Sequence, residues 1–75
     1  MITAAQLRAA RAMLQWSLAE LAERADVSVN SITRFETGLA SPRRATVAAI
    51  QRALEEGGVA FTNGDEPGVK LKRRP

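Results

Sequence analysis

The chain has 75 residues, of which 45% are hydrophobic and 25% are charged, and its net charge is +3. A chain of this length forms at most one domain. It contains no cysteine and no histidine, which excludes disulfides, thiolate or imidazole metal sites, and nucleophile–imidazole catalysis. We therefore expect no enzymatic activity, no cofactor and no metal.

Charged and apolar residues are unevenly distributed along the chain. No apolar run approaches the roughly 20 residues of a membrane-spanning helix, and the first residues lack the pattern of a secretory signal. We expect a cytoplasmic protein with no membrane partner. Segment 27–54 contains four arginines and one acidic residue, and the last nine residues contain four basic residues and no acidic one. Segment 27–54 therefore predicts a patch of positive potential.

Helical spacing of apolar residues predicts a first helix over residues 3–15 and a second helix that begins after Ser17. Ser17 and Glu20 have the spacing of a capping box, in which each side chain accepts a hydrogen bond from the other residue's amide. Trp16 and Leu21 stand at the two positions of a hydrophobic staple around this cap. We expect Trp16 to pack against the protein.

A third helix is predicted over residues 29–37, with Ser28 as its cap and Gly38 ending it in a left-handed conformation. A very short turn separates it from the second helix. Two helices that each bury one face across so tight a turn favour the steep crossing of a helix-turn-helix.

Two charged residues fall on apolar helix faces. Arg11 shares the stripe of Leu7 and Leu14 in the first helix, and Glu36 shares the inward face of Ile32 in the third. We expect Arg11 and Glu36 to form a structural ion pair, because an unpaired buried charge is costly. The alternative is two independent solvated charges.

The opposite face of the third helix has the composition of a base-reading surface. Asparagine can pair with adenine, arginine with guanine, and the methyl groups of threonine and valine suit the thymine methyl in the major groove. The alternative is an ordinary solvated helix face. The residues of this face are Asn30, Thr33, Arg34 and Thr37, flanked by Val29 and Ser31.

A fourth helix is predicted over residues 43–56, and two arginines begin it. Arg43 and Arg44 are suited to phosphate contacts. Cations at a helix N-terminus are mildly unfavourable, so this pair indicates an external anion. A hydrated arginine pair is the alternative.

The composition changes after Gly58, where apolar residues alternate with small or polar ones. This pattern predicts a short β-hairpin with its turn near Asn63-Gly64 or Pro67-Gly68. A lone hairpin is marginal in water, so we expect it to pack on the helices or to pair with another chain. The alternative is a disordered basic tail. We thus divide the chain into a helix-turn-helix domain, 1–58, and a hairpin with a basic tail, 59–75.

The stretch from Leu7 to Leu54 resembles the Cro/cI-type, or XRE, family of helix-turn-helix transcriptional regulators. The matching segments are Leu21-Ala22, Val27-Ser28, residues 32–38, Pro42, Thr46-Val47, Ile50 and Ala53-Leu54. The resemblance implies a compact, mainly α, four-helix lambda-repressor-like fold. It also implies that residues 28–37 form the recognition helix.

The family's site residues can be carried over position by position. Base contacts fall on Val29, Asn30, Ser31, Thr33 and Arg34, and the family's structural ion pair falls on Arg11 and Glu36. Leu18 stands where the family usually has a glutamine, and this departure weakens one expected phosphate contact. Asp26 replaces the usual glycine of the turn and is expected to adopt the left-handed conformation. The expected phosphate contacts are Ser17, Leu18, Thr37, Gly38 with its neighbouring amides, Arg43 and Arg44.

Together these observations predict a sequence-specific double-stranded DNA-binding protein, a transcriptional regulator that acts as a homodimer. The alternative is a protein-interaction module, such as an antitoxin-like component, that uses Leu18, Val29, Leu39 or the C-terminal hairpin to bind a partner protein.

Overall fold

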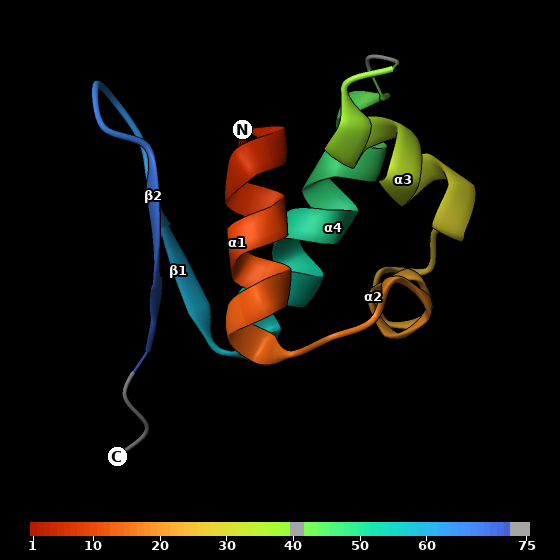
Figure 1. The fold of residues 1–75 in the computed structure, drawn as a ribbon, viewed down its shortest axis with the longest axis horizontal. Coiled ribbons are helices and arrows are strands. Elements are labelled where there is room, and N and C mark those ends of the chain that lie inside the picture. Colours follow the sequence, from red (N-terminus) through yellow and green to blue (C-terminus); the bar gives the residue numbers. More distant parts are fainter. Residues whose placement is uncertain (40–41, 73–75) are drawn as a thin grey trace.

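The computed structural model describes residues 1–39 and 42–72, which form four helices and a two-stranded antiparallel hairpin (Figure 1). This confirms the predicted fold class. None of the helices within these ranges has the length and hydropathy that a membrane span requires. The elements are α1 (Ala4–Leu14), α2 (Leu18–Ala25), α3 (Val29–Thr37), α4 (Arg44–Gly57), β1 (Val59–Thr62) and β2 (Gly68–Leu71).

Side-chain caps start α1 and α2, but in different ways. The full capping box lies at α1, where the Thr3 side chain accepts from the Gln6 amide and the Gln6 side chain accepts from the Thr3 amide. At α2, Ser17 Oγ accepts from the Glu20 amide at 3.0 Å. The Glu20 carboxylate binds Arg24, one turn along the helix. The capping box predicted at Ser17 is therefore only half formed, because Arg24 competes for its acid.

Left-handed residues end the first three helices. Asp26 ends α2 with a φ of 57°. This is the left-handed conformation predicted for the turn, which usually favours glycine. Its amide donates to Glu23 O at 3.3 Å. Ser28 then caps α3, which begins at Val29, so only three residues separate α2 from α3. This short turn makes the predicted helix-turn-helix.

Each helix contributes to one apolar core. Leu7 of α1 and Ile32 of α3, which were predicted to face inward, are fully buried, and Leu14 packs against the core. Helices α2 and α4 add Leu21 and Ile50. The hairpin adds Val59, so the core extends past the helices. The largest fully buried side chains are Leu7, Leu21, Ile32, Ile50, Leu54 and Val59.

Trp16 packs between α2 and the end of α4. It is half-buried against the core, as predicted from the staple position. A Cβ built on Gly57 would lie 2.5 Å from the Trp16 ring, so Gly57 leaves the space that the ring fills. The Arg24 guanidinium lies 4.4 Å from the ring centroid, a distance at which a cation is attracted to the ring.

The hairpin packs against α1 and the end of α4. Residues 63–67 connect its strands, so the loop is longer than either predicted two-residue turn. Its apolar face brings Val59, Phe61 and Val69 toward the core. The alternative of a disordered tail is therefore wrong for residues 59–72, whereas the basic Arg73 and Arg74 lie outside the described residues.

A buried glutamine joins the hairpin to α1. Gln6 is 4% exposed, and its Nε2 donates to Thr62 O at 2.8 Å and to Gly68 O at 3.1 Å. These carbonyls stand opposite each other at the loop end of the two strands. Gln6 therefore fixes the loop end of the hairpin on the first turn of α1.

Candidate nucleic-acid interface

The outward face of α3 carries the side chains predicted to read bases. Asn30 and Arg34 are exposed, Val29 is 40% exposed, and Ser31 and Thr33 are half-buried. The cap orders the start of this face, since Ser28 Oγ accepts from the Ser31 amide at 3.0 Å and donates to Ser31 Oγ at 2.8 Å. The helix therefore presents short polar groups and one arginine to solvent.

An open groove joins this face of α3 to the start of α4. Asn30, Ser31 and Arg34 line one wall, and Arg43 and Thr46 line the other. Phe35 and Pro42 complete the lining. No carboxylate is among these lining residues, all of which belong to the described ranges. The groove thus combines hydrogen-bonding groups with two guanidinium groups and suits an anionic ligand.

The two arginines at the start of α4 are both exposed. Arg43 occupies the N-cap position, where its side chain makes no capping hydrogen bond within the described structure. Arg44 is the first helical residue. Both guanidinium groups sit at the positive end of the helix dipole, where an external anion would offset the unfavourable interaction.

The C-terminal end of α3 uses its own donors internally. The Gly38 amide donates to Phe35 O at 3.2 Å, and the Leu39 amide donates to Arg34 O at 3.1 Å. Thr37 Oγ1 donates to the carbonyl oxygen one turn earlier at 2.8 Å. The phosphate contacts expected of Thr37 and Gly38 therefore require these bonds to open, and in this conformation the two residues offer no ready donor.

The start of α2 offers neutral hydrogen-bonding groups in place of the cationic side chains at the start of α4. Ser17 is exposed and its Oγ is held by the Glu20 amide. Leu18 is half-buried against the core, so its side chain serves packing. The amide of Leu18 lies in the first helical turn, where amides have no acceptor within the helix. Any phosphate contact by Leu18 therefore involves its backbone.

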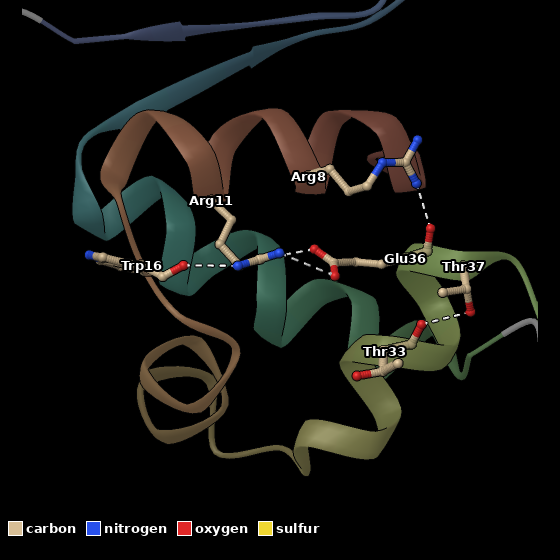
Figure 2. A network of polar contacts seen from close by, with 6 residues as sticks. All are labelled: Arg8, Arg11, Trp16, Thr33, Glu36 and Thr37. Atoms are coloured by element: carbon tan, nitrogen blue, oxygen red, sulfur yellow. Dashed lines mark hydrogen bonds and ion pairs between the residues drawn. The ribbon is translucent and has the colours of Figure 1, made fainter.

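Two arginines of α1 hold Glu36 of α3 (Figure 2). Arg11 Nε lies 2.9 Å from Glu36 Oε1, and Arg11 Nη2 lies 3.5 Å from Glu36 Oε2. Arg11 Nη1 also donates to Trp16 O at 3.0 Å, which ties the linker before α2 to the same network. Glu36 is 9% exposed and Arg11 is 27% exposed. The ion pair thus links α1 to α3 inside the domain.

Arg8 is a residue that the sequence analysis missed. Its Nη1 donates to the backbone carbonyl of Glu36 (Figure 2). Arg8 precedes Arg11 by one turn, and residues three apart share a helix face. That spacing is the sequence signal that would have placed Arg8 beside Glu36.

The polar groups of the groove are amides, hydroxyls and guanidinium groups. No group of three or more Asp or Glu residues in the described ranges is placed to hold a metal ion. The groove instead offers amide, hydroxyl and guanidinium groups on a helix and its neighbour. These groups bind by hydrogen bonding and charge.

Comparisons with known proteins agree with this geometry. A family model described as a helix-turn-helix domain matches residues 3–60. The matched region contains α1 to α4 and the first residues of β1. A search of curated protein sequences found no match to the chain.

Proposed function

The chain belongs to the helix-turn-helix domain family, a class of DNA-binding domain, and we propose that it binds specific sequences in double-stranded DNA to regulate transcription. In this proposal α3 lies in the major groove and α2 crosses the phosphate backbone. The proposed setting is the cytoplasm.

The groove between α3 and α4 is the observation that carries the proposal. Many solvated helices carry side chains of these types, so the composition of the α3 face alone does not distinguish a DNA-binding helix. Here they share a groove with Arg43 of α4, and Arg44 lies exposed beside it in sequence. Base contacts on one wall and phosphate contacts on the other are what a helix needs when it enters a major groove.

Each exposed group of α3 has a chemical counterpart on base edges. Asn30 is suited to adenine N6 and N7, and Arg34 to guanine O6 and N7. Val29 offers only apolar contact, which suits a thymine methyl group. Ser31 and Thr33 are less exposed and are assigned supporting contacts. Specificity in this proposal therefore depends mainly on Asn30 and Arg34.

Phosphate contacts are assigned to the starts of α2 and α4 and to the end of α3. Arg43 and Arg44 supply cationic donors, and Ser17 with the Leu18 amide supplies neutral ones at α2. Thr37 and Gly38 are assigned contacts at the end of α3, made after their internal bonds open. These contacts hold the protein in register without reading sequence.

A homodimer is part of the proposal. A single domain of this size has a small interface, and a two-fold dimer reads two half-sites about 34 Å apart. A palindromic preferred sequence with that spacing supports the dimer, and a single half-site contradicts it.

Selection from a random pool of duplexes tests the proposed function. We expect enrichment of a defined motif, and we expect affinity for that duplex to exceed affinity for a scrambled duplex. Affinity for both should fall steeply between low and physiological salt, because bound cations are released from DNA. Failure to enrich any motif would contradict sequence-specific binding.

A protein partner is the second candidate, and exposed apolar residues favour it. Met1 is 64% exposed and Leu39 is 77% exposed, and both line an apolar hollow beside the end of α3. Leu71 of the hairpin is 58% exposed on the other side of α1. Binding through these residues would depend little on salt, in contrast to DNA binding.

A further inference from the structure

The end of the proposed recognition helix is fixed to α1 at two points. Arg11 holds the carboxylate of Glu36, and Arg8 holds its carbonyl oxygen. We infer that Arg8 is a positioning residue, which sets the orientation of α3 for base reading without itself contacting a base. This inference rests on the proposed DNA-binding function.

Arg8 supplies a donor that α3 lacks. The last four carbonyl groups of a helix have no partner within it. The amides of Gly38 and Leu39 satisfy Arg34 O and Phe35 O, but the carbonyl of Glu36 lies nearer the end. Arg8 Nη1 donates to this oxygen and brings a positive charge to the negative end of the helix dipole.

The two arginines constrain different movements. Arg11 binds the side chain of Glu36, and the torsion angles of that side chain still allow the backbone of α3 to shift. Arg8 grips the backbone itself, one turn earlier on α1, and Figure 2 shows the two contacts on either side of Glu36. A second attachment point restricts rotation of α3 about the first.

Base reading is sensitive to such rotation, and phosphate binding is not. A bidentate pair between a side chain and a base edge needs both hydrogen bonds in line. Contacts with phosphates tolerate displacement, because they depend mainly on charge. Loss of the Arg8 contact is therefore expected to reduce sequence preference more than overall DNA affinity.

The test compares Arg8→Met, Arg8→Lys and the control Arg52→Met. Methionine keeps much of the side-chain volume without a donor, and lysine restores a charged donor. Arg52 is also exposed, and it lies on α4 outside the groove lining. Each methionine variant removes one positive charge, so the two are expected to lose scrambled-duplex affinity equally.

We expect Arg8→Met to weaken binding of the selected duplex about threefold to tenfold more than Arg52→Met does, as the loss of one hydrogen bond predicts. Arg8→Lys should recover most of this loss. Amide hydrogen exchange without DNA gives an independent readout. The Gly38 and Leu39 amides should exchange about threefold to tenfold faster in Arg8→Met and unchanged in Arg52→Met.

Three results separate the possible failures. A wild-type protein that does not distinguish the two duplexes overturns the proposed function. If the wild-type protein prefers the selected duplex, but Arg8→Met loses affinity for the selected and the scrambled duplex equally, only the inference is overturned. Arg8 would then be assigned a phosphate contact. Unchanged exchange at Gly38 and Leu39 also overturns it, because Arg8 would then not hold the end of α3.

Discussion

Replacing Glu36 with alanine should destabilise the domain strongly, because it leaves Arg11 without its carboxylate. Breaking a buried ion pair typically costs about 3–5 kcal/mol. Glu36 is 9% exposed, but Arg11 is 27% exposed, so water can solvate part of the remaining charge. We therefore expect the free energy of unfolding to fall by about 2–3 kcal/mol. A 75-residue domain has about 4–11 kcal/mol in total, so this loss is a large fraction.

Urea unfolding followed by circular dichroism measures this loss, and the melting temperature should fall by roughly 10–20 °C. Glu20→Ala is the matched control, because Glu20 forms an ion pair with Arg24 in which both side chains are well exposed. Its cost should stay below about 1 kcal/mol. The double variant Arg11→Ala/Glu36→Ala should cost less than the sum of its parts. An unfolding midpoint for Glu36→Ala that matches the Glu20→Ala control would refute the reasoning.

Three further predictions concern other parts of the molecule. Arg34→Ala should weaken binding of the preferred duplex by about 1–3 kcal/mol and relax the preference at one base pair. Arg44→Ala should instead weaken binding of all duplexes alike and reduce by about one the slope of log affinity against log salt concentration. Titrations against single-base variants of the duplex distinguish these outcomes. Gln6→Ala should speed amide exchange in the hairpin, since two carbonyl oxygens lose their donor, and slow exchange there would show that apolar packing alone holds the strands. Gly57→Ala should displace the Trp16 ring, lower the free energy of unfolding by about 1–3 kcal/mol and shift the tryptophan fluorescence. An unchanged fluorescence spectrum would show that the ring accommodates the added methyl group without moving.

Local patterns were sufficient to predict the helices and the turn between α2 and α3. The Ser17 and Ser28 side chains accept hydrogen bonds from amides in the first turns of α2 and α3, as predicted, and Asp26 adopts the left-handed conformation. These features depend on residues three or four apart, so the sequence contains the information directly. The same rule placed Arg11 and Glu36 on inward faces, although it could not specify their distance.

Contacts between distant segments were not predictable in the same way. Gln6 donates to carbonyl groups 56 and 62 residues away, which depends on where the hairpin docks. Spacing alone places Arg8 on the helix face of Arg11, but it does not reveal which atom Arg8 binds, because that partner is a backbone oxygen. The capping box at Ser17 is only half formed, because Arg24 offers the Glu20 carboxylate a competing partner. Competition and docking are properties of the folded chain.

The placement of the hairpin has a consequence for engineering. Figure 1 shows α1 between the hairpin and α3, and α1 packs on both. The connecting residues 63–67 are exposed. Lengthening an exposed loop adds little closure entropy, and such loop tips are the sites where insertions succeed. A peptide tag inserted there would lie on the far side of α1 from the groove between α3 and α4, and would leave the shape and charge of that groove intact.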